Sequence, residues 1–298
     1  MKYDKLIALF FCLTIFFTFF SGIIRDDVDE AAYLELANEP QFDCVGQVFH
    51  DTTVTGSCVL INSQFALTAA HVLLTNDTRQ DTVKMNGQVY ITHIPVNVRV
   101  ANASNIYFQI NGRKVRAKKL ILHPEYLKNL EKGDCDIALI ELEEPIQSIV
   151  PAHMYTLADE LSSNVVGVGF GASGKANRPD SIVIQGKKIA GENVVDKISG
   201  AKYDGKETIL SCDFDAATLK GCNKMGSPTP RPLEYICAGG DSGGGLFKQN
   251  GEDWFLVGIC SGGGTNLDQL MKTGYYGQVM DWTRVSVFDG WIDSMMAN

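Results

Sequence analysis

Basic clusters, heptad repeats and low-complexity tracts are absent from this sequence, and helical periodicity is scarce. Charged residues make up only 20% of the 298 positions, with 35 acidic against 26 basic side chains and a net charge of −9. The lack of a basic patch argues against nucleic acid as a partner, because binding phosphates needs clustered lysine and arginine. The 45% hydrophobic content instead predicts a well-buried core, in one large β domain or two fused halves.

Metal and nucleotide sites also have little support in the sequence. It contains no Cys-x2-Cys pair and no histidine cluster with the spacing of zinc ligands. The segment 169–176 satisfies G-x-G-x-x-G, but Ala176 stands where a P-loop needs serine or threonine to hold magnesium. The residues that follow include Pro179 and do not favour a helix. We therefore expect no cofactor and no bound metal.

The longest apolar run lies at the N-terminus. Lys2 and Lys5 flank the start of the run Leu6–Phe20, and Ser21-Gly22 supplies small residues for cleavage. This pattern predicts a signal peptide over residues 1–22, with an uncleaved anchor as the alternative. The run is short for a membrane span, and no later segment is apolar enough to be one. We therefore expect a secreted monomer, extracellular or periplasmic, without stable membrane association after cleavage.

Removal of this segment also removes Cys12 and leaves an odd number of cysteines. Export permits disulfides, and an odd count leaves at least one thiol free or paired between chains. The seven cysteines concerned are Cys44, Cys58, Cys135, Cys212, Cys222, Cys237 and Cys260.

Short β-rich runs separated by Gly, Asn and Asp turns fill most of the remaining chain, which predicts an all-β barrel or sandwich. Asn86-Gly87 and Asn111-Gly112 stand where hairpins would turn. Helices are expected only briefly after His71 and over Val287–Met296. The segment Glu144–Leu157, with two prolines, is the best candidate for a linker between two halves.

Three segments supply the residue types that a serine nucleophile needs. A serine hydroxyl requires a histidine to accept its proton and a carboxylate to orient that histidine. LTAAH ends an apolar strand at His71, DIALIEL opens another at Asp136, and GDSGG presents Ser242 on a glycine-rich turn. Each motif alone is more typical of ordinary structure, but the three together indicate serine hydrolase chemistry.

Gly240–Gly244 also fits the G-x-S-x-G nucleophile elbow of α/β-hydrolases. In that fold the catalytic histidine follows the serine along the chain. The last histidine of this sequence is His153, so none follows Ser242. This order argues strongly against a lipase or esterase.

The three motifs resemble the signatures of trypsin/chymotrypsin-like serine proteases, and the likeness extends from about Cys44 to the C-terminus. Further matching segments are Ile61–Gln64, Ile121–Tyr126, Gly169–Gly171 and Phe288–Ile292. The resemblance implies a protease domain over 23–298, built as two packed six-stranded antiparallel β-barrels with a C-terminal helix. The first barrel would cover about 23–150 and the second about 158–298.

The resemblance also implies a role for each matching residue. His71 would be the general base and acid, Asp136 would orient it, and Ser242 would be the nucleophile. The backbone N–H groups of Gly240 and Ser242 would form the oxyanion hole. Ser261, together with Gly263, would lie on the strand that binds substrate.

Two further expectations follow from the resemblance. A disulfide would join Cys222 to Cys237 and close the loop before the nucleophile turn. Asp241 would pair with a buried N-terminal ammonium, since a buried carboxylate needs a partner. Cleavage after Gly22 would supply that ammonium on Ile23.

The sequence departs from the family where substrate specificity is set. The residues Cys237-Ala238-Gly239 run directly into the nucleophile turn, so the usual pocket-wall loop is missing. Asp281 could favour basic substrate side chains or could be a solvated turn residue, and we favour the second. The leading hypothesis is a secreted serine endopeptidase that acts on proteins or peptides. The alternative is an inactive trypsin-fold binding protein.

Overall fold

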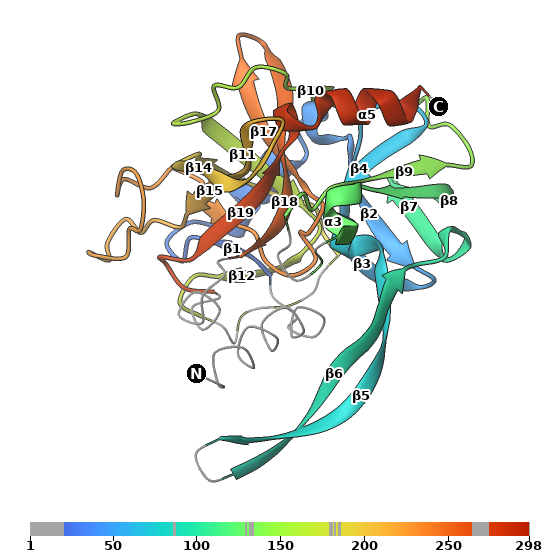
Figure 1. Cartoon of the computed structure of the whole chain (residues 1–298). Coiled ribbons are helices and arrows are strands. Elements are labelled where there is room, and N and C mark those ends of the chain that lie inside the picture. The colour runs from blue at the N-terminus through green and yellow to red at the C-terminus, as the bar shows by residue number, and fades with distance from the viewer. Residues whose placement is uncertain are drawn as a thin grey trace.

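The first half of the chain forms a closed antiparallel barrel (Figure 1). The computed structural model describes residues 21–85, 88–128, 130, 134–178, 181, 183, 186–263 and 274–297. Around the barrel the strand order is β2-β3-β4-β9-β8-β7. The bounds are β2 Val45–His50, β3 Thr53–Leu60, β4 Phe65–Thr68, β7 Ile106–Ile110, β8 Arg113–Leu122 and β9 Ala138–Leu142.

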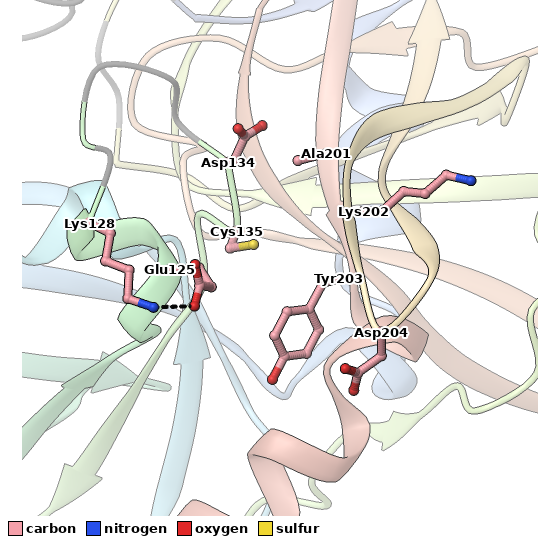
Figure 2. Close-up of a pocket in the computed structure, with 8 residues that line it drawn as sticks. All are labelled: Glu125, Lys128, Asp134, Cys135, Ala201, Lys202, Tyr203 and Asp204. Atoms are coloured by element: carbon pink, nitrogen blue, oxygen red, sulfur yellow. Dashed lines mark hydrogen bonds and ion pairs between the residues drawn. The ribbon is translucent and has the colours of Figure 1, made fainter.

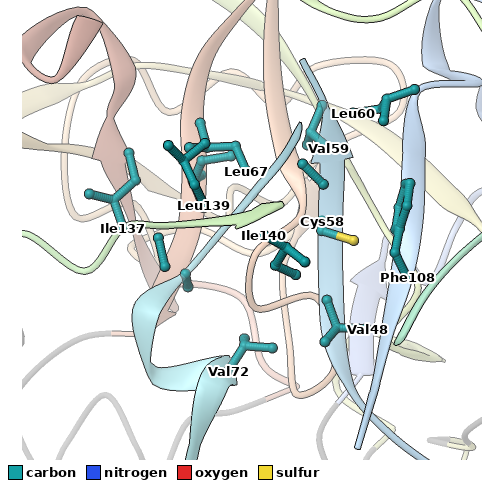
Figure 3. Packing of buried hydrophobic residues seen from close by; sticks show 14 of the residues in the cluster. Val48, Cys58, Val59, Leu60, Leu67, Val72, Phe108, Ile137, Leu139 and Ile140 are labelled. Carbon is teal, nitrogen blue, oxygen red and sulfur yellow. The ribbon is translucent and has the colours of Figure 1, made fainter. Parts of the chain in front are cut away.

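Alternating apolar side chains fill the barrel. In β7, Ile106, Phe108 and Ile110 are buried while the two residues between them are partly exposed, as the two-residue period of a strand requires. Figure 3 shows Phe108 among the buried residues of the barrel, with Val48 on the neighbouring strand β2 and Leu60 on β3. The barrel therefore closes around a dry core, from which the ends of the strands emerge.

The hairpin between β7 and β8 turns where the sequence predicts. Asn111 and Gly112 have φ angles of 44° and 76°, so both lie in the left-handed region. A two-residue turn of this kind matches the right-handed twist of the paired strands. The other expected turn, at Asn86-Gly87, lies outside the described residues.

The second half is a sheet of eight strands in the order β13-β11-β17-β18-β19-β15-β14, with β10 paired to β18. The all-β class and the six-stranded first barrel are confirmed, and this sheet has more strands than the expected second barrel. Its members are β10 His153–Met154, β11 Asn164–Gly169, β13 Ile189–Val194, β14 Lys197–Tyr203, β15 Lys206–Asp213, β17 Gly245–Asn250, β18 Asp253–Gly263 and β19 Val279–Arg284.

The N-terminal strand joins the second half and not the first. β1 (Ser21–Ile24) lies between β12 (Ala172–Lys175) and β16 (Tyr235–Ile236) in a three-stranded sheet. Ile23 and Ile24 are buried there. The expected start of the first barrel near residue 23 therefore does not match the described pairing.

Two long strands extend well beyond the first barrel (Figure 1). They are β5 (Leu74–Met85) and β6 (Gln88–Val100), which pair only with each other. The first strand of this ribbon directly follows the short helix η3 (Ala70–Leu73), which contains His71. The sequence predicts a short helix at this place. The ribbon therefore projects from the barrel beside the candidate histidine.

Helices are few, and the expected C-terminal helix is confirmed as α5. Within the described part of the chain, no helix is long and apolar enough to cross a membrane. The predicted signal peptide lies outside the described residues except for Ser21 and Gly22. The remaining helices are α2 Glu30–Ala37, η2 Pro40–Phe42, η4 Ala103–Asn105, α3 Pro124–Lys128, η6 Val285–Val287 and α5 Asp289–Met296.

The predicted linker connects the two halves through backbone hydrogen bonds. Ala152 N donates to Leu60 O in the first barrel, and Tyr155 N donates to Leu256 O in the second sheet. Between them, β10 pairs in parallel with β18. The linker is thus fixed to both halves.

One buried ion pair allows a test of this packing. Arg284, 4% exposed, holds Glu160, fully buried, through Nη2–Oε2 and Nε–Oε1 distances of 2.6 and 3.1 Å. Replacing Arg284 by Met leaves a buried carboxylate without its cation, which costs about 3–5 kcal/mol of unfolding free energy. We expect this loss in urea unfolding of Arg284→Met.

The matched control is Arg113→Met, which breaks the exposed Arg113–Glu144 pair. Exposed pairs contribute about 0–1 kcal/mol. Equal losses for the two variants would contradict the assigned burial of the Arg284 pair.

Candidate active site

His71 and Asp136 meet at one end of the first barrel although 65 residues separate them. β4 and β9 pair side by side, and each residue stands next to the end of one of these strands. The His71 Nδ1 atom lies 2.6 Å from Asp136 Oδ2, and the His71 backbone N–H donates to Asp136 Oδ1 at 2.9 Å. Both oxygens of the carboxylate therefore fix the histidine.

The second half of the chain completes the surroundings of Asp136. Ser261 Oγ on β18 donates to Asp136 Oδ2 at 2.8 Å, and Thr283 Oγ1 on β19 donates to Asp136 O at 2.9 Å. Asp136 is only 3% exposed. Ser261 and His71 thus hold the Asp136 carboxylate, which in turn holds the imidazole in one orientation.

The charge state of His71 follows from two opposing effects. Burial lowers its pKa, whereas the charge of Asp136 and the hydrogen bond to it raise the pKa. The net result is a pKa above the ordinary value of 6.5. His71 can therefore accept a proton readily and hold it beside Asp136.

Ser242 lies on a tight turn between β16 and β17. Gly244 N donates to Asp241 O at 2.7 Å, and Gly243 N donates to Cys260 O on β18 at 2.8 Å. Gly243 has a φ of 85°, and a Cβ atom there would lie 2.1 Å from Ser57 O. Only glycine fits such a position, which explains the glycine after Ser242.

The Ser242 turn packs against the His71 segment through β3. Ser57 N donates to Ser242 O at 2.7 Å. A Cβ atom on Gly56 would lie 2.7 Å from Ser242 O and 2.8 Å from Val72 Cγ2. Gly56 thus lets the turn approach the residue that follows His71. These contacts bring the Ser242 turn close to the short helix η3, which contains His71.

Two backbone N–H groups of the turn are available to a ligand. Among the described residues, the N–H groups of Gly240 and Ser242 donate to no protein acceptor. Gly240 has a φ of 94°, and its carbonyl accepts from Ser57 Oγ at 2.9 Å. Ser57 Oγ in turn accepts from Phe170 N at 3.0 Å. Ser57 thereby holds the carbonyl of the peptide bond between Gly240 and Asp241.

Asp241 points inward from the same turn and is 1% exposed. Burial raises its pKa to about 6, against the hydrogen bonds from Ala238 N, Gly171 N and Tyr235 that lower it. A Cβ atom on Gly22 would lie 3.2 Å from Asp241 Oδ2, so the N-terminal strand does reach this carboxylate. The described chain is continuous through Gly22 and Ile23, and pairing with an Ile23 ammonium stays a prediction.

Ser261 and Gly263 lie on β18, as expected for a strand near the site. Gly262 and Gly263 pair with Asp281 and Met280 of β19, after an irregularity that begins at Cys260. This bulge turns Ser261 toward Asp136. β18 therefore places Ser261 beside Asp136 and ends two residues later, at Gly263.

Asp281 is not a solvated turn residue, and that expectation is wrong. It lies within β19, is partly buried, and accepts a hydrogen bond from Ser211 Oγ at 2.6 Å. Burial raises its pKa above the ordinary value, against the Ser211 hydrogen bond that lowers it. Asp281 is the third residue of β19, which begins at Val279.

A cavity of about 320 Å³ opens beside the chain that leads to Asp136. Figure 2 shows Glu125 paired with Lys128 on one side and Tyr203 and Asp204 on the other. Cys135 lines it from the residue directly before Asp136. The two halves thus leave a space beside Cys135, with mixed charge and one aromatic ring.

The implied bond between Cys222 and Cys237 is absent, which corrects that expectation. All seven described cysteines are free. The Cys222 thiol is partly exposed and donates to Leu219 O at 3.2 Å, whereas the buried Cys237 thiol interacts with Cys260. The two sulfurs differ because Cys237 follows β16 into the core and Cys222 lies in a loop.

Sequence reasoning did not identify Ser57 and Tyr235, which both support the nucleophile turn. Ser57 has no motif, and its role depends on the pairing of β3 with the second half. Tyr235 directly precedes the turn in the chain but resembles an ordinary strand aromatic. As for ligands, no group of three or more His, Cys, Asp or Glu among the described residues could hold a metal ion.

Comparison with known proteins agrees with this geometry. The family model described as Trypsin matches residues 35–292. One similar protein is the CLIP domain-containing serine protease B14 of Anopheles gambiae, 26% identical over 187 residues. The match covers 60% of this chain and 46% of that relative, so the chain spans less than half of the relative's length.

The pairing of His71 with Asp136 predicts a measurable histidine pKa. We expect the His71 imidazole to titrate above the ordinary histidine value, since the nearby carboxylate outweighs burial. Asp136→Asn removes the charge and leaves burial, so the pKa falls. Nitrogen NMR of the imidazole in both proteins measures this. An unchanged or higher pKa in Asp136→Asn would contradict the assigned cause, and exposed His153 is the internal control.

Proposed function

Because the chain belongs to the trypsin family of serine proteases, we propose that it is a secreted serine endopeptidase that hydrolyses peptide bonds in proteins or peptides. The observation that carries this proposal is the His71–Asp136 pair, with the Ser242 turn packed through β3 near the residue that follows His71. The residues can act together only if all three lie at one site.

The chemistry would begin with Ser242. Its Oγ attacks the carbonyl carbon of the substrate peptide bond while His71 accepts the hydroxyl proton. Asp136, held at 2.6 Å from His71 Nδ1, orients the ring and stabilises the imidazolium that forms. His71 then donates the proton to the departing amine, which leaves an acyl group on Ser242. Water, deprotonated by His71, releases the acid and restores the serine.

Charge that develops on the carbonyl oxygen would be stabilised by the N–H groups of Gly240 and Ser242. Both have no acceptor among the described residues, and the carbonyl of Gly240 is held away by Ser57 Oγ. Donors fixed before the reaction act without reorganisation, and one such donor contributes about 10²–10³-fold in rate. The turn geometry thus supplies a second contribution beyond the triad.

Substrate binding would use β18 near Ser261 and Gly263. An extended peptide can add to an exposed strand edge through backbone hydrogen bonds. The cavity lined by Tyr203 and Asp204 lies next to the triad on the side of Asp136. The pocket-wall loop before Gly240 is missing from the sequence, so preference for a substrate side chain depends on other segments. We further propose export through residues 1–22 and action as a monomer.

The missing loop is also the observation that favours a second function. A trypsin-fold protein without its specificity wall could bind a protein partner and cut nothing. The complete set of His71, Asp136 and Ser242 favours catalysis over this alternative.

Covalent labelling separates the two functions. A fluorophosphonate forms a stable adduct with a serine only when a base activates it. We expect the exported protein to be labelled on Ser242, and Ser242→Ala to lose labelling and about 10⁶-fold in peptide hydrolysis. Labelled-peptide mass spectrometry and a casein assay measure this.

The control variant is Ser104→Ala, which removes an exposed hydroxyl in η4 and should change neither readout. Folded wild-type protein that remains unlabelled would favour the binding protein over the protease.

A further inference from the structure

The carboxylate of Asp241 is held by three donors of the chain itself. Tyr235 Oη donates to Asp241 Oδ2 at 2.8 Å, Ala238 N donates to the same oxygen at 3.0 Å, and Gly171 N donates to Oδ1 at 2.8 Å. These three hydrogen bonds fix both carboxylate oxygens.

Tyr235 is fixed so firmly that its hydroxyl has one position. It is 2% exposed, and three glycines leave room for its ring. Cβ atoms added at Gly191, Gly22 and Gly167 would lie 2.2, 2.7 and 3.2 Å from Tyr235 atoms. Burial and the charge of Asp241 raise the Tyr235 pKa well above its ordinary value. The hydroxyl therefore remains a donor throughout the working pH range.

Asp241 stands between Gly240 and Ser242, whose N–H groups are the proposed oxyanion donors. Its side chain also holds Ala238 N, and its own N–H donates to Ala238 O at 3.0 Å. Movement of this carboxylate would rotate the peptides on both sides of it. The direction of the two donors is thus linked to the hydrogen bonds of Asp241.

We propose that Tyr235 is a positioning residue whose hydroxyl holds Asp241, and thereby the Gly240 and Ser242 N–H groups, in the oxyanion-binding geometry. This inference rests on the proposed protease function. A hydrogen bond to a buried charge is among the stronger kinds.

Few other titratable side chains lie close enough to Asp241 to affect the pH dependence of its ionisation. Besides Tyr235, the titratable side chains against it are the thiols of Cys237 and Cys260. Burial raises the pKa of both thiols, so they stay neutral across the acid range. His71 belongs to the catalytic pair.

The test is Tyr235→Phe in the full exported chain. We expect kcat to fall about 10–100-fold with KM little changed, because one charged hydrogen bond is lost and Tyr235 does not lie on β18. Loss of the donor raises the pKa of Asp241 from about 6. Because His71 titrates in the same range, we expect the acid limb of kcat to become steeper and to move to higher pH as Asp241 joins His71 there.

The matched control is Tyr155→Phe, which removes another tyrosine hydroxyl bonded to an aspartate, Asp159, away from the turn. It should leave kcat and the acid limb unchanged. N-terminal mass spectrometry of each active protein shows whether Ile23 is the first residue. Unchanged kcat and acid limb in Tyr235→Phe would overturn the proposal. A wild type without labelling or activity would instead reject the protease function.

A second variant keeps the proposal testable if Tyr235→Phe does not fold. Asp241→Asn removes the buried charge. In that background, Tyr235→Phe removes a donor that no longer has a carboxylate to hold. If the hydroxyl acts through that charge, the double variant should match Asp241→Asn within about threefold in kcat. A further tenfold loss would show that Tyr235 acts by another route and would overturn the proposal.

Discussion

The carboxylate of Asp136 is the point at which the two halves of the chain are held to each other. His71 approaches it from the first barrel, and Ser261 approaches it from β18 of the second sheet. A carboxylate that is 3% exposed needs several donors to remain charged. Here those donors come from both halves. Correct packing of the halves is therefore the same event as assembly of the site.

A second buried carboxylate, Asp241, organises the other side of the site. The two carboxylates have different roles. Asp136 fixes the histidine, and Asp241 fixes the turn that carries the serine. Ser57 on β3 holds this turn to the first barrel, since it contacts both Ser242 and Gly240. Glycines at 56, 169, 171 and 243 allow these close approaches, and each would bring a Cβ atom within 3 Å of a neighbour. The proposed protease chemistry depends on rigid parts that exist before substrate binds.

Local features of the fold were predictable from the sequence, and long-range pairing was not. The turn at Asn111-Gly112 and the helix α5 were predicted from short patterns, and the structure confirms both. The candidate triad was recognised from local motifs, since His71 and Asp136 border apolar strands and Ser242 lies on a glycine-rich turn. In contrast, the pairing of β1 with β12 and β16 joins segments far apart in the chain. Periodicity carries no information about such partners, and for the same reason the strand setting of Asp281 was misjudged. The Cys222–Cys237 bond was expected from the family resemblance alone, and both thiols are free.

The most direct measurement of the central claim is a crystal structure of the protein after reaction with a phosphonate ester. The account predicts phosphorus bonded to Ser242 Oγ, with one phosphonyl oxygen about 2.7–3.1 Å from both Gly240 N and Ser242 N. His71 should remain bound to Asp136 in the adduct. An adduct oxygen that points away from both N–H groups would contradict the account, as would a phosphonate on another residue.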